Sequence, residues 1–144
     1  MARINNAEAL RDWLRTCPEI DRTAAFSVDY LGDQAGYALC AAPSELAWRE
    51  NILGEAKPAP RQRTDYWLDA RMPVGADAGQ GLDNLAHWQA MAAWIAAQSA
   101  AGRLPDWEGG RVTAVLPAVS AAPVEAGADM ARYRLRLRVE YETD

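Results

Sequence analysis

The residues that could act as a nucleophile, a general base or a metal ligand are few in this sequence. His87 is the only histidine, and the two cysteines are Cys17 and Cys40. A histidine base would have Asp83, one helical turn earlier, as its available carboxylate. No nucleophile motif surrounds either cysteine, and one histidine with two scattered thiols falls short of a closed zinc site. We therefore expect a helix-surface histidine, two free and mostly buried thiols, and no catalytic residue, metal or cofactor.

A second group of candidates consists of charged residues at two-residue spacing. Asp65 and Asp69 fall on one face of a predicted strand, a spacing compatible with a general acid and a general base. Four arginines share one face of the C-terminal strand: Arg132, Arg134, Arg136 and Arg138. Like charges along one face repel, so these arginines need carboxylates on a neighbouring strand, open solvent or another molecule. Asp65 and Asp69 are the natural cross-strand complement. A solvated or cross-strand-paired charge ladder is therefore favoured over a protein interface, and a protein interface over a phosphate backbone.

Composition limits the classes of protein that these residues could serve. The chain has 144 residues, of which 50% are hydrophobic and 24% charged, and this predicts one folded domain over residues 1–144. A net charge of −5 argues against a protein that mainly coats nucleic acid. The sequence contains no apolar leader at its start and no run of about 18 apolar residues, so we expect neither secretion by that route nor a membrane span. Six tryptophans against one phenylalanine favour contacts between chains, where tryptophan is enriched.

Two strands would position the charged residues. Residues 131–141 alternate without a break, and this places the arginines on one face and large apolar residues on the other. Residues 61–71 alternate in the same way, with Trp67 between Asp65 and Asp69 on the charged face. We expect the two charged faces to lie together in one sheet.

Two amphipathic helices are predicted to cover the other side of that sheet. The first is capped by Asn5 or Asn6 and extends to Cys17, where Pro18 forbids continuation. Its apolar stripe consists of Ala7, Leu10, Leu14 and Cys17. The second helix spans residues 82–99, and its predicted core face consists of Leu85, Trp88, Ala92, Ile95 and Ser99. Trp94 and His87 project from a different side of it, and we expect Trp94 to have a partner outside the subunit.

The remaining segments complete an α+β fold. Residues 26–31 and 37–42 are predicted to form a hairpin, with a short strand at 46–53 and a further strand at 111–116. The predicted loops are residues 54–60, 73–81 and 117–129. This order predicts a mixed, mostly antiparallel sheet with both helices packed on one face and the arginine face left open.

Four stretches of packing and capping residues carry a resemblance to a known family. They are Asn6–Pro18, Val28–Gly32, Trp88–Ala97 with Gly102–Pro105, and Met130–Tyr133. Together with the length, they resemble small proteins encoded among the head and tail genes of tailed phages and prophages, often called minor capsid or tail completion proteins. The arrangement is similar to that of the tail terminators of long-tailed phages.

The resemblance implies a structural virion protein and not an enzyme. Such a subunit assembles as a ring, usually a hexamer, on the end of the tail tube, stops tube polymerisation and joins the tail to the head or neck. The implied partners are other copies of the chain, the tail tube protein and a head–tail connector or neck protein, with no membrane and with DNA only passing through the ring. The implied location is the virion, after assembly in the host cytoplasm.

The same resemblance suggests which residues make contacts. We expect the arginine strand, with Trp67 and Trp94, to contribute to the contact between subunits, although an isolated subunit can stay a monomer until a tail tip templates the ring. The loops 54–60 and 118–129 would touch the tube or the neck.

Two alternatives stay open. One is a small soluble enzyme using Asp65, Asp69 or His87, which a deep pocket converging on those groups would favour. The other is a bacterial interaction domain with no virion role.

Overall fold

The computed structural model describes residues 6–74, 78–127 and 129–144. Within this part of the chain the elements are α1 Asn6–Leu14, β1 Phe26–Val28, β2 Gly36–Ala41, β3 Trp48–Glu50, β4 Ala56–Pro58, β5 Arg61–Pro73, α2 Ala78–Ala100, β6 Gly110–Ala126 and β7 Met130–Thr143. Five strands form the main sheet in the order β1-β2-β5-β7-β6, and β3 and β4 form a separate two-stranded ribbon.

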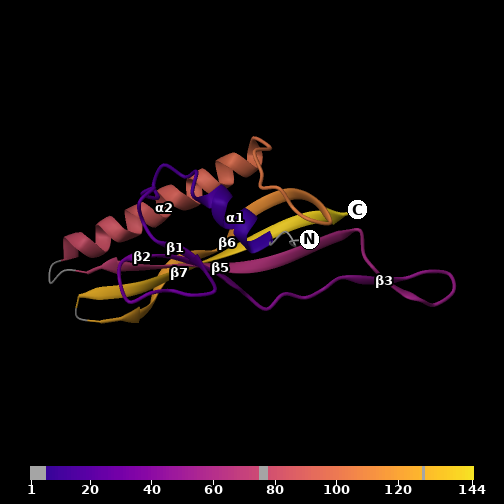
Figure 1. Ribbon diagram of the computed structural model, residues 1–144, viewed down its shortest axis with the longest axis horizontal. Coiled ribbons are helices and arrows are strands. Elements are labelled where there is room, and N and C mark those ends of the chain that lie inside the picture. The colour runs from indigo at the N-terminus through magenta and orange to yellow at the C-terminus, as the bar shows by residue number, and fades with distance from the viewer. Residues whose placement is uncertain (1–5, 75–77, 128) are drawn as a thin grey trace.

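The fold is α+β, as predicted. The sheet is mixed, since β1 pairs with β2 in parallel while the pairs β2–β5, β5–β7 and β6–β7 are antiparallel. Both helices lie on one face of this sheet (Figure 1). The strands β5 and β6 run in the same direction on either side of β7, and α2 is the crossover connection between them.

The core lies between the helices and the apolar faces of β5 and β7. The predicted alternation of β7 is confirmed, because Tyr133, Leu135, Leu137 and Val139 are all buried. The stripe of α1 is also confirmed at Leu10, Leu14 and Cys17, although the helix itself ends at Leu14. The predicted Asn5 cap lies outside the described residues.

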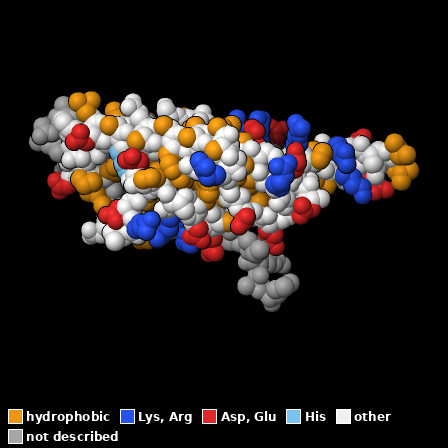
Figure 2. Space-filling model, turned by 90° about the horizontal axis from the view of Figure 1, so that it is seen from above, with side chains coloured by type: hydrophobic (Ala, Val, Ile, Leu, Met, Phe, Trp, Pro, Cys, Tyr) orange, Lys and Arg blue, Asp and Glu red, His pale blue; other side chains and the backbone are white. Residues whose placement is uncertain are grey.

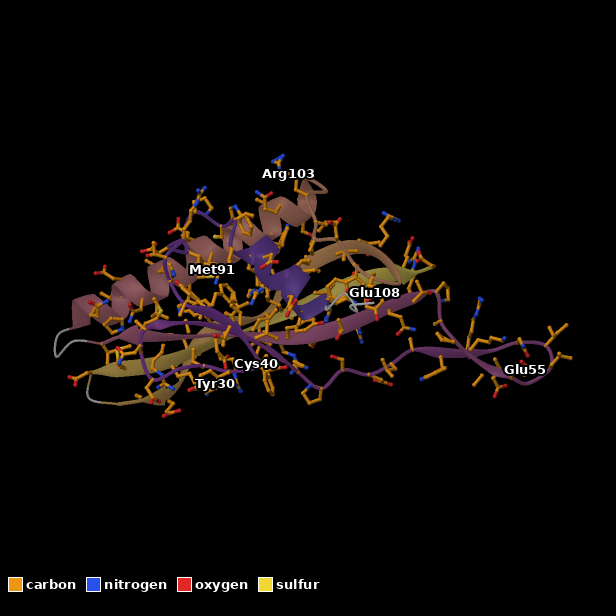
Figure 3. All side chains as sticks on the ribbon, in the orientation of Figure 1. Tyr30, Cys40, Glu55, Met91, Arg103 and Glu108 are labelled. Carbon is orange, nitrogen blue, oxygen red and sulfur yellow. The ribbon has the colours of Figure 1, made fainter. Side chains whose placement is uncertain are left out.

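The core face of α2 is rotated from the predicted one. Trp88 and Ile95 are buried as expected, but Leu85 is exposed, and Asn84 and Met91 are buried in its place (Figure 3 labels Met91). Positions 84, 88, 91 and 95 share a face at helical spacing, so the stripe follows the bulky Met91 and the hydrogen-bonded Asn84. The Asn84 side-chain amide donates to the carbonyl of Pro73 and to the Tyr133 hydroxyl, and these bonds allow a polar residue on this face.

The predicted loop at 117–129 is wrong over most of its length, because β6 continues to Ala126. Its small residues and two prolines, Pro117 and Pro123, suggested a loop. They are tolerated because β6 is an edge strand, where a proline removes no ladder bond on its solvent side. Several register shifts against β7 accompany them.

The predicted hairpin at 26–42 is also wrong, because β1 and β2 run parallel. Residue Asp29 has a positive φ of 63°, which turns the chain sharply after β1. Because β1 has only three residues, the segment 29–35 is long enough to return the chain to the start of β2. Tyr30 of this segment lies on the face of the sheet opposite the helices (Figure 3).

Three further boundaries differ from prediction. Residues 48–50 alone of the predicted strand 46–53 form β3, and its partner β4 occupies residues 56–58 of the predicted 54–60 loop. In the predicted 73–81 loop, β5 extends to Pro73 and α2 begins at Ala78, while 75–77 lie outside the described residues.

Candidate functional site

The pairing of β5 with β7 brings the predicted charged residues together. The register places Asp65 opposite Arg138 and Asp69 opposite Arg134, with Trp67 between them opposite Arg136. All of these side chains lie on the face away from the helices, because the alternate positions of both strands are in the core. We call this set the arginine ladder, which consists of Asp65, Asp69, Arg132, Arg134, Arg136 and Arg138.

Asp69 is the most buried member of the arginine ladder. Its side chain is fully buried and accepts hydrogen bonds from two arginines. Arg134 donates through Nε at 2.9 Å and through Nη2 at 3.0 Å, and Arg132 donates through Nε at 3.1 Å and also through Nη2. These bonds occupy both carboxylate oxygens, so the cost of burying this charge is offset by two cations.

Asp65 has the same role farther along the sheet. Its carboxylate accepts from Arg136 Nε at 2.7 Å and from Arg138 Nε at 3.4 Å. Arg136 also donates to the carbonyl of Pro43 at 3.4 Å. The predicted cross-strand complement is therefore confirmed, with each aspartate shared by two arginines.

Trp67 contributes to the arginine ladder through its ring. The guanidinium carbon of Arg134 lies 4.1 Å from the ring centroid, within the range of a cation–π contact. The hydrogen bonds that Arg134 donates to Asp69 raise the pKa of its guanidinium above the usual value. Arg134 is thus held between a carboxylate and an aromatic face, and its planar group has little freedom to reorient.

The arginine ladder carries more positive than negative charge. Four guanidinium groups against two carboxylates leave a surplus of two positive charges, and the arginine side chains remain between 25% and 36% exposed. The segment 29–35 borders this face, since Arg71 Nε donates to the carbonyl of Gly32 at 2.9 Å. The ladder is therefore an ordered cationic surface that an acidic surface could meet.

His87 lies away from the arginine ladder, where α2 meets β2. Its Nε2 is 2.8 Å from the Tyr37 hydroxyl and its Nδ1 is 4.0 Å from Glu19 Oε2, so its described partners do not include the predicted Asp83. It is partly buried, and not on an open helix surface. Burial lowers the pKa of His87, which Glu19 partly opposes, and burial raises the pKa of Tyr37 to about 12. A hydroxyl with a raised pKa is a poor nucleophile, so this contact has the features of a structural junction.

Both thiols are free, as predicted, with Cys17 buried and Cys40 half-buried. Burial raises the pKa of each, and this favours the unreactive thiol over the thiolate. Among the residues that the structure describes, no group of three or more histidine, cysteine or carboxylate side chains could hold a metal ion.

A hollow of about 640 Å³ lies where the β3–β4 ribbon joins the sheet. Its lining includes Glu45, Arg61, Arg63, Thr113 and Glu140, and it includes none of the side chains of Asp65, Asp69 and His87. The groups assigned to the enzyme alternative do not converge on this hollow.

Sequence reasoning missed a set of apolar side chains on the ribbon. Leu46, Trp48, Ile52 and Leu53 are all largely exposed, and Ile52 is fully so. The available signal was a cluster of bulky apolar residues between Pro43 and Pro58, in a stretch too short and irregular to bury them.

Trp94 has a partner within the chain. Its ring lies 5.1 Å from that of Trp13 on α1, and Trp13 Nε1 donates to the carbonyl of Arg103. Trp94 thus joins the two helices, and the reason for expecting an external partner for it no longer applies. Its role at an interface, like that of the other predicted interface residues, stays a prediction.

Comparison with known proteins adds information on the fold. No family model matches the chain, and no curated protein matches it in sequence. One solved structure is similar to this chain with a TM-score of 0.54 and 12% sequence identity, with 96% of this chain and 92% of that chain covered. At this identity the likeness shows a shared fold alone. No helix in the described part of the chain is long and apolar enough to cross a membrane.

Proposed function

We propose that this chain is a structural virion protein that caps the end of a phage or prophage tail tube as a ring and joins the tail to the head or neck. Two lines of argument support it: the resemblance to tail terminators, and the surfaces that the subunit leaves open. The observation that carries the proposal is the β3–β4 ribbon, which extends beyond the main sheet and carries exposed apolar side chains (Figure 1). Exposed apolar side chains gathered on a projecting element are typical of a subunit that is completed by its neighbours.

The arginine ladder would serve as a polar contact face in this ring. Its guanidinium groups are already ordered by Asp65 and Asp69, so binding to an acidic neighbouring surface would cost little further entropy for fixing them. In a ring the contact is heterologous, so one face of a subunit meets a different face of the next. The surplus positive charge of the ladder fits an acidic face on a chain whose net charge is −5.

The internal contacts of the subunit favour a structural role over catalysis. The aspartates assigned to the enzyme alternative are each occupied by two arginines, and His87 is held by Tyr37. A general acid or base must be free to exchange a proton with a substrate, and a fully buried, doubly paired carboxylate such as Asp69 is poorly placed to do so.

Electron microscopy of tails made with and without this chain tests the proposal. Without the chain we expect tubes of uncontrolled length that fail to join heads, and expression of the chain from a plasmid should restore both length and joining. Tails of normal length attached to heads in its absence would overturn the proposal.

The contribution of the arginine ladder has its own test. Arg134→Ala combined with Arg136→Ala should reduce the amount of ring on purified tails, as measured by native mass spectrometry. Normal ring assembly by a folded double variant would remove the ladder from the interface.

A further inference from the structure

The β3–β4 ribbon and its turns, residues 46–59, project from the body of the molecule, and we call them the arm. A two-stranded ribbon without a covered apolar face is at best marginally stable in water. The arm nevertheless has a defined shape, and Glu55 near its tip lies far from both helices and from the main sheet (Figure 3). Something other than a core of its own must hold it in place.

A buried glutamine fixes the base of the arm. Gln62, on β5, is 8% exposed, and its side-chain Nε2 donates to the carbonyls of Ala47 at 2.7 Å and Ala59 at 3.0 Å. Its Oε1 accepts from the backbone N–H of Ala47 at 3.1 Å. One side chain therefore ties both ends of the arm to the sheet.

An asparagine fixes the tip in a similar way. The side-chain Oδ1 of Asn51 accepts from the backbone N–H of Leu53 at 2.9 Å and of Glu55 at 3.0 Å. Gly54 adopts a positive φ of 80°, which a residue with a side chain rarely does, and its N–H donates to the carbonyl of Asn51. Ile52 and Leu53 are thus presented on a closed, ordered turn, and such preorganisation lowers the entropy lost on binding.

The chemistry of the arm limits what it can contact. Its two basic residues, Arg49 and Lys57, are balanced by Glu50 and Glu55, and Lys57 lies 3.8 Å from Glu55. The tip itself, Ile52 to Gly54, has no charge, with Ile52 fully exposed and Leu53 77% exposed. The surface complementary to the tip is therefore apolar and uncharged.

The same chain exposes such a surface on the outer side of α2. Leu82 is 67% exposed and Leu85 is 40% exposed. Further exposed residues at helical spacing continue this face, which consists of Leu82, Leu85, Ala86, Gln89, Ala93, Ala96, Ala97 and Ala100. None of these eight side chains is charged, and the exposed Asp83 lies at one border of the face. A helix that is apolar on both sides is normally covered on both. Figure 2, which views the helix side, shows hydrophobic side chains along this part of the body and again at the end of the arm.

We propose that the arm of one copy lies on the outer face of α2 of a second copy. The inference rests on the proposed function, because it names a second contact, besides the arginine ladder, by which neighbouring subunits meet. The arm extends away from α2 of its own chain, so the pairing must join two molecules (Figure 1). The arm and the helix face are different surfaces, so each copy binds one neighbour through its arm and a second neighbour through its α2 face. Such a heterologous contact builds a closed ring or an open chain of subunits. Both surfaces belong to one chain, so the α2 face of a second copy is the apolar binding surface that the tip of the arm requires, and no other protein is needed.

Cysteine cross-linking tests the contact directly. One preparation carries Ile52→Cys and a second carries Ala93→Cys, each with Cys40→Ser, so that the buried Cys17 is the remaining native thiol. We expect a mixed disulfide dimer from these two preparations, in concentrated solution or on purified tails. As a matched control, Ala118→Cys on the exposed part of β6 replaces Ala93→Cys and should give little dimer. Equal cross-linking to both positions, or dimers of Ile52→Cys with itself, would overturn the inference.

Loss of the apolar tip gives a second measurement. Ile52→Ser with Leu53→Ser should weaken self-association about thirtyfold, as expected for loss of a central apolar contact. The control is Val124→Ser, which removes an exposed apolar side chain from the end of β6 and should leave association unchanged. Sedimentation velocity over a range of concentrations measures both.

The outcomes separate this inference from the proposed function. If the chain caps tails but Ile52→Cys and Ala93→Cys do not cross-link there, the inference fails and the proposed function stands. If the two positions cross-link but tails form normally without the chain, the proposed function fails and the inference stands. Cross-linking of Ile52→Cys on tails to the tube protein alone would assign the arm to a different partner and overturn the inference. A chain that stays monomeric at every concentration and gives no cross-link on tails would also overturn it.

Discussion

The arginine ladder and the arm both adjoin strand β5, yet the burial of their side chains is opposite to what polarity alone would predict. In the ladder, charged side chains are drawn into the subunit, where Asp69 is fully buried and each aspartate is shared by two arginines. In the arm, apolar side chains such as Ile52 and Leu53 are left in solvent. The polarity of a residue therefore does not tell whether it is free to meet a partner. The contacts already made within the subunit decide this.

The comparison also explains how a chain can be stable alone and still require assembly. The ladder ties the two central strands of the sheet together, so its loss should cost stability. The arm contributes almost nothing to the core, so its loss should cost association alone. Substitutions in the two regions can test this division, from the largest expected effect on stability to the smallest.

Replacement of Asp69 should have the largest effect. Asp69→Asn removes the carboxylate that Arg132 and Arg134 share, and the Asp69 side chain is fully buried. We expect the free energy of unfolding to fall by about 3 kcal/mol, as for the breaking of other buried ion pairs. Urea denaturation measures it. The control Glu140→Gln, on the same face of β7 but outside the ladder, should change stability by less than about 0.5 kcal/mol. Equal effects would mean that the ladder is only a surface feature.

Replacement of Gln62 should have an intermediate effect, confined to the arm. Gln62→Ala removes three hydrogen bonds at the arm's base. We expect the free energy of local unfolding of the arm to fall by about 1.5 kcal/mol. Proteolytic cleavage between residues 46 and 59 should become faster. Limited proteolysis with mass mapping of the cut sites checks this. Thr113→Ala, which removes one exposed hydrogen bond, is the control. An arm as protected as in the unaltered chain would show that Gln62 does not hold it.

Replacement of Trp67 tests the aromatic component of the ladder. Trp67→Leu keeps an apolar side chain but removes the ring beneath the Arg134 guanidinium. A double-mutant cycle with Arg134→Ala should give a coupling free energy of about 1 kcal/mol, in the range of partly exposed cation–π contacts. A coupling of zero would mean that the two groups are neighbours without interaction.

His87 should make stability weakly dependent on pH. Burial lowers its pKa in the folded chain below the usual value of about 6.5, so the unfolded chain binds a proton more readily. Stability should be fully present above about pH 6.5 and be lost as the pH falls through the lower folded value. His87→Gln should flatten this section of the profile, measured as the denaturation midpoint from about pH 7.5 to about pH 5. A profile that keeps its slope would assign the effect to other groups.

Replacement of the arm's tip should have the smallest effect on stability. Ile52→Ser with Leu53→Ser removes two apolar side chains that have little contact with the subunit. The free energy of unfolding should change by less than about 0.5 kcal/mol, as for most exposed positions. Chemical denaturation of the monomer is the measurement. A loss above about 1 kcal/mol would show that these residues pack within the subunit and would remove the contrast between arm and ladder.

The central region of the fold could be predicted because its signals are strong and local. Unbroken alternation in residues 131–141 and 61–71 predicted both strands and their faces, and charge complementarity predicted that Asp65 and Asp69 meet the arginines. Which aspartate binds which arginine could not be predicted, because that depends on the register between two strands that lie far apart in the sequence.

Other features depended on context that periodicity does not carry. The prolines and small residues of 117–126 indicate a loop unless the strand is known to lie at an edge, beside β7. The strands β1 and β2 run parallel, and side-chain alternation is the same for parallel and antiparallel pairs, so alternation could not predict this direction. The exposure of Ile52 and Leu53 was missed because a short apolar stretch has the same pattern whether it is buried or exposed, and the one signal was the short, irregular segment between Pro43 and Pro58 that contains it.

The position of β7 has a consequence for biosynthesis. It lies between β5 and β6 in the sheet but is made after both of them, so the ribosome releases the flanking strands before the strand that joins them exists. Until β7 emerges, Asp65 and Asp69 have no arginines of the ladder to pair with, and the apolar faces of β5 and β6 lack their shared neighbour. The nascent polypeptide cannot complete its sheet during translation, and during that interval its unpaired strand edges are exposed to chaperones and to other nascent chains.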